Sequence, residues 1–267
     1  PGARTHGTRR GHATTLHADR SGFARIGQIA GADTGRQAPE DGVRFYRQAG
    51  WSDEALATYR ARFGGFGKMI DRLPDSFRRL ADGQGIRIGD HDWEVVVGRG
   101  HSPEHASLYC RSLRLLISGD QVLPRISSNV SVYPTEPAAD PLADWLDSLA
   151  LLRRRVADDV LVLPAHNEPF QGLHLRLGQL GDSVAQGLAK LRARLDEPRR
   201  VVDVFGALFR RPITNEPHLL SLATGESLAH LHYLVGRGEA RLVRIEDGVA
   251  WYGLAQGAAA DPAQPAD

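Results

Sequence analysis

Three apolar runs in this sequence each end at a turn that carries a histidine or an aspartate, and this feature constrains the fold most. The run VVVGRGH ends in His101, LLISGD ends in Asp120, and VLVLPAH ends in His166. Apolar runs of about four to eight residues bounded by Gly or Pro are typical of buried strands. We therefore predict three strands of one sheet whose matching ends bring the three polar side chains together.

These three side chains are of the types that bind metal ions. Imidazole nitrogen and carboxylate oxygen are donors that zinc, iron or manganese accepts, and one carboxylate can bridge two ions. Taken singly, each residue has an ordinary explanation, because a histidine after a strand is usually a surface or capping residue and Asp in S-G-D is a common turn residue. The prediction of a metal site at His101, Asp120 and His166 depends on their combination.

Composition excludes several other classes of protein. Lys and Arg number 33 against 32 Asp and Glu, so no global basic field favours nucleic acid as the main partner. No apolar stretch approaches the roughly 20 residues of a membrane span, so we expect no membrane partner. The single cysteine, Cys110, excludes an internal disulfide and favours a cytoplasmic location.

The pattern along the chain predicts an α/β protein in two domains. We expect an irregular or altered segment at 1–35, a main domain at 36–197, a small domain at 198–254 and a solvated tail at 255–267. In the main domain we predict two helices between Pro39 and Leu80 that lie over a sheet, the second capped by Ser52. The other expected elements are a hairpin around GDHD at 89–92, strands at 106–109, 114–117 and 160–164, the last fully buried, and helices at 140–156 and 172–195.

The small domain has the pattern of a winged helix. A helical stretch at 201–209 is followed by HLLSLATGESLAHLHYLVGRG, which we interpret as helix, turn and helix, and then by two strands joined at Asp247-Gly248. Arginines in this domain offer local positive charge for phosphate contacts, whereas the candidate recognition helix is mostly apolar. Packing against the main domain is therefore favoured over binding of nucleic acid.

The order of these motifs resembles that of a known family. Strand, G-H-S-P-E-H, strand, S-G-D, strand and P-A-H-N-E form the pattern of the second half of a metallo-β-lactamase-fold hydrolase. The chain looks most like bacterial members related to hydroxyacylglutathione hydrolases and to the LACTB-like branch with a carboxyl-terminal winged helix. The resemblance implies an αββα sandwich with an incomplete amino-terminal part, and it covers roughly residues 33–254.

The resemblance also implies roles for individual residues. His101 would bind a first metal ion, His166 a second, and Asp120 would bridge both and act in catalysis; the ions would be two Zn²⁺, with Fe or Mn as alternatives. SGDQVLPRISSNVSVYP at 118–134 resembles the loop that lines the active-site mouth in this family. The predicted supporting or substrate-loop residues are Glu104, His105, Asn129, Tyr133 and Asn167.

The family's H-x-H-x-D-H motif, which supplies four more ligands, is missing. With His6 placed on its first histidine, the next required positions hold Thr8, Arg10 and Gly11. The chain begins at Pro1 and its only methionine is Met69, so one explanation is a fragment or an altered reading frame. The other is a divergent pseudoenzyme. In either case we expect impaired metal binding.

The expected function is metal-dependent hydrolysis of a small-molecule thioester or ester-type acyl substrate, with phosphodiester cleavage also known in the superfamily. Two alternatives remain open from the sequence: a nucleic-acid-binding or nuclease-type protein that uses the winged helix, and a catalytically silent scaffold. The sequence predicts neither the substrate's identity nor the oligomeric state.

Overall fold

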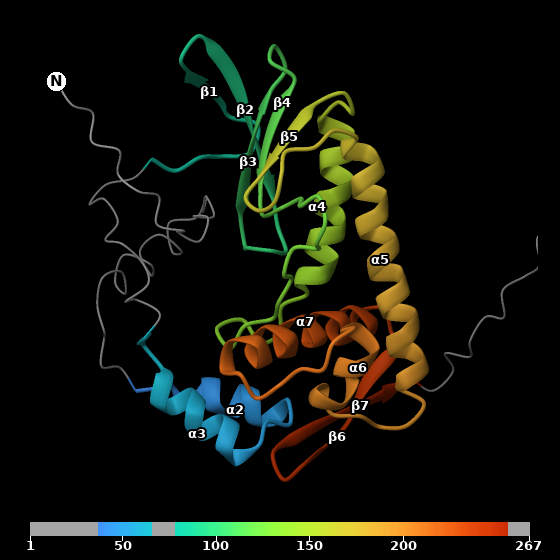
Figure 1. Cartoon of the computed structure of the whole chain (residues 1–267). Helices are drawn as coiled ribbons and strands as arrows, with labels where there is room; N and C mark the ends of the chain where they lie inside the picture. The colour runs from blue at the N-terminus through green and yellow to red at the C-terminus, as the bar shows by residue number, and fades with distance from the viewer. Residues whose placement is uncertain (1–36, 66–77, 256–267) are drawn as a thin grey trace, which may run out of the picture.

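The computed structural model describes residues 37–65 and 78–255, which form a five-stranded sheet and a smaller carboxyl-terminal unit connected by one long helix (Figure 1). The predicted irregular segment 1–35 and all but the first residue of the predicted tail lie outside the described residues. The elements are α2 (Glu40–Gln48), α3 (Asp53–Arg62), β1 (Gly85–Ile88), β2 (His91–Gly98), β3 (His105–Cys110), β4 (Leu115–Gly119), α4 (Pro141–Arg155), β5 (Leu161–Pro164), α5 (Leu173–Arg194), the 3-10 helix η2 (Val201–Val204), α6 (Phe205–Leu208), α7 (Pro217–Gly236), β6 (Ala240–Glu246) and β7 (Val249–Leu254).

The sheet has the order β1-β2-β3-β4-β5, in which the first four strands are antiparallel and β5 runs parallel to β4. The predicted hairpin is confirmed, with His91 as the first residue of β2 and paired with Ile88. The prediction that 160–164 is fully buried is wrong. Leu161 is exposed while Val162 is buried, because β5 stands at the edge of this sheet and successive side chains of a strand point to opposite faces.

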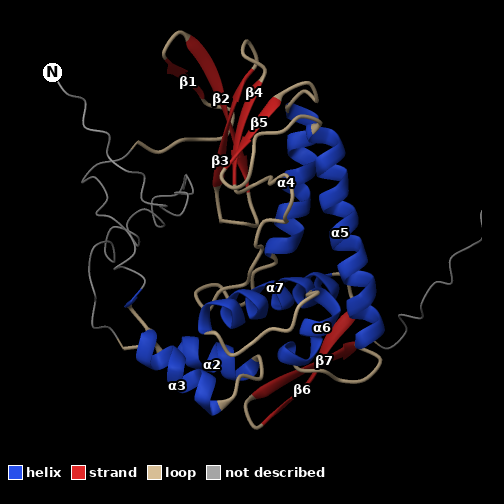
Figure 2. Cartoon of the chain, in the orientation of Figure 1, coloured by secondary structure: helices blue, strands red, loops and turns tan. Residues whose placement is uncertain are grey.

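Both faces of the sheet are apolar. Val96 and Leu116 point to one face and join the core formed with α4 and α5, which pack beside the sheet (Figure 2). Val95 and Leu108 belong to a second cluster with Cys110, which is fully buried and acts as a small hydrophobic residue. Successive side chains of a strand alternate between faces, so the unbroken apolar runs place hydrophobic residues on both. This mixed sheet with its helices is the α/β fold that the sequence predicts.

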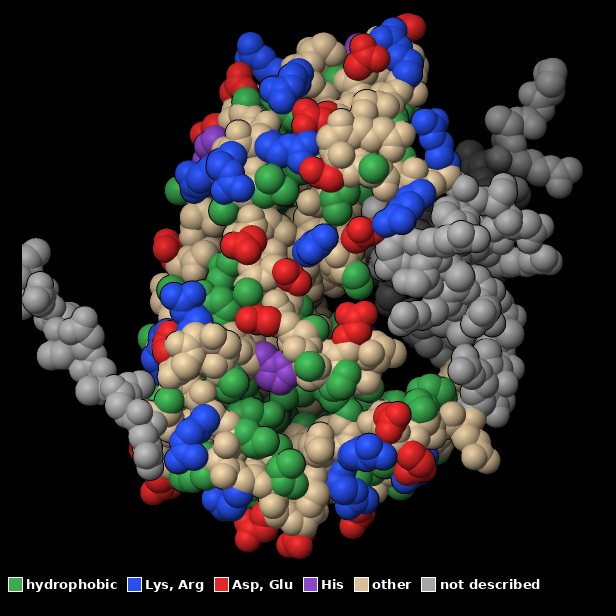
Figure 3. Space-filling view, turned by 180° about the vertical axis from the view of Figure 1, so that it is seen from behind, with side chains coloured by type: hydrophobic (Ala, Val, Ile, Leu, Met, Phe, Trp, Pro, Cys, Tyr) green, Lys and Arg blue, Asp and Glu red, His purple; other side chains and the backbone are tan. Residues whose placement is uncertain are grey.

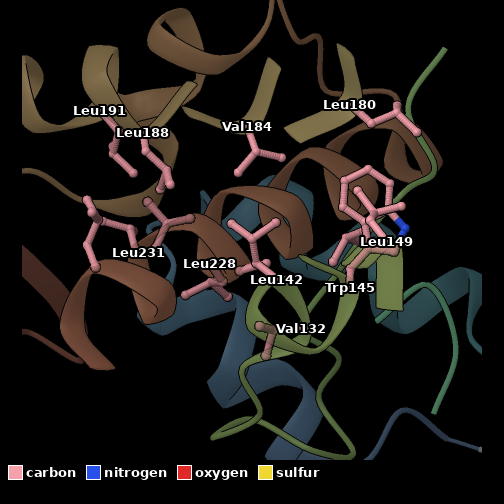
Figure 4. Packing of buried hydrophobic residues seen from close by; sticks show 14 of the residues in the cluster. Val132, Leu142, Trp145, Leu149, Leu180, Val184, Leu188, Leu191, Leu228 and Leu231 are labelled. Carbon is pink, nitrogen blue, oxygen red and sulfur yellow. The ribbon is translucent and has the colours of Figure 1, made fainter. Parts of the chain in front are cut away.

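The carboxyl-terminal unit shares the core of α4 and α5. Figure 4 shows Leu142 of α4, Val184 and Leu188 of α5, and Leu228 of α7 converging from three helices. The spans of α4 and α5 agree with the predicted helices, and Asp140 caps α4 by accepting a hydrogen bond from the backbone N–H of Ala143.

Helices α2 and α3 lie against the carboxyl-terminal unit, so the prediction that they cover the sheet is wrong (Figure 1). Trp51, in the turn between them, donates from Nε1 to Thr224 Oγ1 of α7 at 2.9 Å. Ser52 caps α3 as predicted, but this helix ends at Arg62. The rest of the predicted helix, including Met69, lies largely outside the described residues.

The predicted helix–turn–helix is also wrong, because residues 217–236 form the single helix α7. Gly225, in the middle of the segment interpreted as helix, turn and helix, lies within α7. Its lack of a side chain allows close packing, since a Cβ atom there would lie 2.7 Å from Ser131 Cβ. The β6–β7 hairpin is confirmed, with positive φ angles at Asp247 and Gly248. No helix in the described part of the chain is long and apolar enough to cross a membrane.

Candidate active site

The strands before His101, Asp120 and His166 end at the same edge of the sheet. β2 and β4 are each antiparallel to β3 and β5 is parallel to β4, so β2, β4 and β5 run in one direction. The three polar residues follow these strands directly. The shared strand direction therefore gathers side chains that are far apart in the sequence.

Asp120 lies between the two histidines, with one carboxylate oxygen near each. Its Oδ2 is 3.7 Å from His101 Nε2, and its Oδ1 is 3.3 Å from His166 Nε2. The Asp120 side chain is only 10% exposed, whereas that of His166 is 52% exposed. The site thus has a buried carboxylate at its centre and opens to solvent on the side of His166.

The hydrogen bond of His101 determines what its second nitrogen presents to Asp120. Nδ1 lies 2.8 Å from the backbone carbonyl oxygen of Asn129. A carbonyl can only accept, so Nδ1 carries the hydrogen, and in the neutral ring the lone pair is on Nε2. That lone pair faces the Asp120 carboxylate. Two electron-rich groups in this arrangement are stabilised by a cation or a proton between them.

His105 lies behind Asp120. It is buried, and its Nε2 accepts a hydrogen bond of 3.1 Å from the backbone N–H of Asp120. Gly119 makes this approach feasible, because a Cβ atom at this position would lie 2.7 Å from the His105 ring and the backbone φ is +53°. His105 therefore holds the Asp120 backbone in place, and the lone pair of its Nε2 is used in this hydrogen bond.

Further polar contacts join the loop after β2 to the loop after β4. Gln121 is fully buried and donates from Nε2 to the carbonyl oxygen of Arg99 at 3.1 Å. The backbone carbonyl oxygen of Gln121 accepts a hydrogen bond of 3.3 Å from Trp145 Nε1 of α4. Ser128 donates to the carbonyl oxygen of Asp120. The sequence analysis did not identify Gln121 or Ser128, because no local period distinguishes a buried polar residue in a loop.

The other predicted supporting residues lie in different settings. Glu104 pairs with Arg79 at 3.4 Å, and no hydrogen bond joins it to His101 or His166 in the described structure. Asn167 is exposed with a φ of +66°, which gives it a role in the turn after His166. Tyr133 is 48% exposed at the end of the loop.

The donors present match a metal site in kind but not in number. Each half of the site offers one imidazole and a shared carboxylate, whereas a catalytic zinc ordinarily takes about three protein ligands. Within residues 37–65 and 78–255, no group of three or more His, Cys, Asp or Glu side chains could hold a metal ion. The described residues therefore supply part of a metal centre and not a complete one.

Comparison with known proteins agrees with this description. The family model for the metallo-β-lactamase superfamily matches residues 33–166, just over half of the chain, and a model for the metallo-β-lactamase-like carboxyl-terminal domain matches residues 188–255. The chain therefore belongs to the metallo-β-lactamase superfamily, with the carboxyl-terminal domain found in some of its members. A search of curated proteins gives no match.

Two solved structures share this architecture. A β-lactamase domain protein from Burkholderia ambifaria is 39% identical, with a TM-score of 0.73, and the match covers 79% of this chain and 60% of that one. A metallo-β-lactamase family protein from Thermus thermophilus is 24% identical, with a TM-score of 0.62 and coverage of 79% and 67%. The second supports the fold alone. The chain thus spans about three fifths of the length of the Burkholderia relative.

Proposed function

We propose that this chain carries the Asp120 half of a hydrolase site for thioester or ester-type acyl substrates, dependent on divalent metal. Zinc is the first candidate and iron or manganese the alternatives. The observation that supports this proposal is the position of Asp120, whose two carboxylate oxygens face His101 and His166 separately. We further propose that the site is impaired in this chain, since the donors are too few for a complete centre.

When bound, divalent metal ions in such a site lower the pKa of water and polarise the carbonyl oxygen under attack. The residues of this chain would position the metal-binding groups. Asp120 supplies negative charge at the centre, and the Asn129 carbonyl keeps the Nε2 lone pair of His101 directed toward it. His105 and Ser128 hold the Asp120 backbone from both sides.

The substrate class in this proposal follows from the resemblance to hydroxyacylglutathione hydrolases and the LACTB-like branch. The loop that follows β4 runs from Asp120 to the half-exposed Tyr133, so it is a suitable wall for an acyl group. Phosphodiester substrates are the second class to test. The absence of H-x-H-x-D-H from the sequence makes both a truncated or altered enzyme and a pseudoenzyme consistent with impaired activity.

Nucleic-acid binding has less support. Helix α7, where a recognition helix was predicted, has 10 of its 20 residues buried, and acidic and basic side chains are interspersed over the face shown in Figure 3. The proposed partner is therefore a small acyl substrate, and the proposed location is the cytoplasm.

The proposal is tested by metal analysis and turnover of the full chain. Elemental mass spectrometry after incubation with Zn²⁺, Fe²⁺ or Mn²⁺ is expected to show weak uptake that chelator removes. Thioester, ester and phosphodiester hydrolysis is then measured with and without added Zn²⁺. Zinc-stimulated thioester or ester turnover supports the enzyme, and zinc-stimulated phosphodiester turnover alone would replace the acyl substrate. No metal uptake, even in a chain with the missing motif restored upstream, refutes the proposal.

A further inference from the structure

Helix α7 of the carboxyl-terminal unit contacts the loop after β4, in which the Asn129 carbonyl accepts the hydrogen bond from His101. The backbone N–H of Val132 donates to the carbonyl oxygen of Gly225 at 3.0 Å, and a Cβ atom on Gly225 would lie 2.9 Å from the carbonyl oxygen of Val132. Such distances mean that helix and loop meet backbone to backbone. A side chain next to Gly225 on the helix is therefore well placed to act on the loop.

Glu226 is that side chain. Its Oε2 accepts a hydrogen bond of 3.3 Å from Asn129 Nδ2. The oxygen of the same amide, Asn129 Oδ1, accepts a bond of 2.7 Å from Ser131 Oγ. The Asn129 side chain is thus held at both ends, which defines its amide orientation and limits the motion of its backbone.

The environment of Glu226 is unfavourable for a carboxylate. Burial raises the pKa of Glu226 to about 7, against the hydrogen bond from Asn129, which lowers it. No ion pair of Glu226 with Lys or Arg is present in the described part of the chain. Burying a carboxyl group without such a pair costs free energy, so packing alone would be better served by an apolar residue.

The contacts form a continuous series from α7 to the active site. Glu226 binds the Asn129 side chain, and the Asn129 backbone carbonyl accepts the hydrogen bond from His101 Nδ1. We propose that Glu226 is a positioning residue for His101, which acts through Asn129 to keep the imidazole in the Nδ1–H form with its Nε2 lone pair toward Asp120. The functional importance of that lone pair rests on the proposed function, whereas the test of the inference is independent of it.

Two substitutions separate positioning from packing. Glu226→Gln keeps a carbonyl oxygen that can accept from Asn129 Nδ2, and Glu226→Met keeps a similar volume without an acceptor. The measurement is long-range ¹H–¹⁵N NMR of the full chain near pH 9, where imidazole is ordinarily neutral. The His101 resonances are assigned by their loss in His101→Gln, and no metal or substrate is added.

We expect the Nδ1–H form of His101 to predominate in the wild type and in Glu226→Gln. In Glu226→Met the ratio of the two ring forms is expected to shift toward Nε2–H by about fivefold, which corresponds to the net contribution of one hydrogen bond. An unchanged ratio in Glu226→Met, or an equal shift in Glu226→Gln, overturns the proposal. If the His101 ratios respond as expected but the full chain shows neither metal uptake nor turnover, the proposed function alone is refuted.

A second variant keeps the test decisive if Glu226→Met does not fold. Asn129→Leu removes the amide that links Glu226 to the loop and retains the backbone carbonyl that faces His101. We expect the same shift of His101 toward the Nε2–H form in Asn129→Leu. If His101 instead remains in the Nδ1–H form in this variant, the proposal is also overturned. Thermal unfolding of each variant identifies those that are folded.

Discussion

The backbone N–H of Asp120 donates a hydrogen bond to Nε2 of the buried His105. This bond fixes the main chain of Asp120, while the two carboxylate oxygens of its side chain remain directed to His101 and His166. A histidine that sequence motifs place beside the proposed metal ligands thus supports the main chain of one of them, Asp120. Gly119, the last residue of β4, allows this contact because it has no side chain.

Replacement of Gly119 by alanine tests that contact. Gly119 and Gly89 have similar φ angles of +53° and +57°, so alanine at either position costs about 1 kcal/mol of conformational free energy. Only the new Cβ atom at 119 would meet the His105 ring, at 2.7 Å; at 89 it meets nothing within 4 Å. We expect Gly119→Ala to lose about 1–3 kcal/mol more unfolding free energy than Gly89→Ala. Equal losses in urea denaturation would contradict the proposed close contact.

Asp120→Asn is expected to weaken zinc binding by at least about tenfold, because it removes the charge between His101 and His166 without a change in shape. Isothermal titration calorimetry of the full chain measures this affinity. The matched control is Asp182→Asn, an exposed position on α5. If both variants bind zinc as the wild type does, Asp120 is not a ligand.

Glu226→Gln is expected to change the dependence of stability on pH. The folded-state pKa of Glu226 is about 7 and that of an unfolded glutamate is about 4.5, so the folded form binds the extra proton between these values. Its contribution to stability therefore falls as pH rises from about 4.5 to 7 and is constant above. We expect Glu226→Gln to be more stable than the wild type by up to about 3 kcal/mol at pH 8 and nearly equal at pH 4.5.

Comparison of Glu226→Gln with the wild type separates the effect of Glu226 on stability from that of the nearby His230. Burial lowers the pKa of His230, which works in the opposite sense, but this histidine is present in both proteins and cancels. Urea unfolding across pH 4.5–8 provides the measurement. Glu136→Gln, at an exposed position, controls for net charge and is expected to show no such dependence. A constant difference between Glu226→Gln and wild type would show that Glu226 does not carry the altered pKa.

Arg155→Met is expected to destabilise the protein by about 1–3 kcal/mol at neutral pH. Arg155 of α4 binds both Asp82 and Glu94 and is only 21% exposed, so its loss leaves two carboxylates without their shared cation. Arg87→Met, which breaks an exposed pair with Asp92, is the control, with an expected loss below about 1 kcal/mol.

The effect of Arg155→Met should also depend on pH. The hydrogen bond from Arg155 holds the pKa of Glu94 below its usual value, with burial opposing it. This contribution to stability is present above the unfolded-state pKa and is lost as pH falls through the folded-state value. The difference between variant and wild type should therefore shrink in acid. A difference that grows on acidification would contradict this account of the Arg155 network.

The convergence of His101, Asp120 and His166 could be predicted from the sequence because it depends on local signals. Apolar runs identify strands, and polar residues after them occupy strand ends whenever the strands run in one direction. The spans of α4 and α5 and the β6–β7 turn were predictable for the same reason. Each depends on a period, a cap or a turn within a few neighbouring residues.

The partners of these elements were not predictable, because a period shows that a face is buried without showing what covers it. The helical pattern of α2 and α3 suggested a sheet beneath them, but tertiary packing places α2 against β7 and α3 against α7. Gly225 is in the middle of the segment interpreted as helix, turn and helix, yet it lies inside a helix at a backbone contact with the loop after β4.

By itself, the sequence determined which side chains stand at the ends of the strands and which chemistry they can offer. Only the tertiary structure decided that His105 supports Asp120 and that Glu226 reaches the loop of Asn129. The physical reason is the range of the interactions. Strand and helix signals act between near neighbours, whereas these two hydrogen bonds join residues 15 and 97 positions apart that the fold brings together.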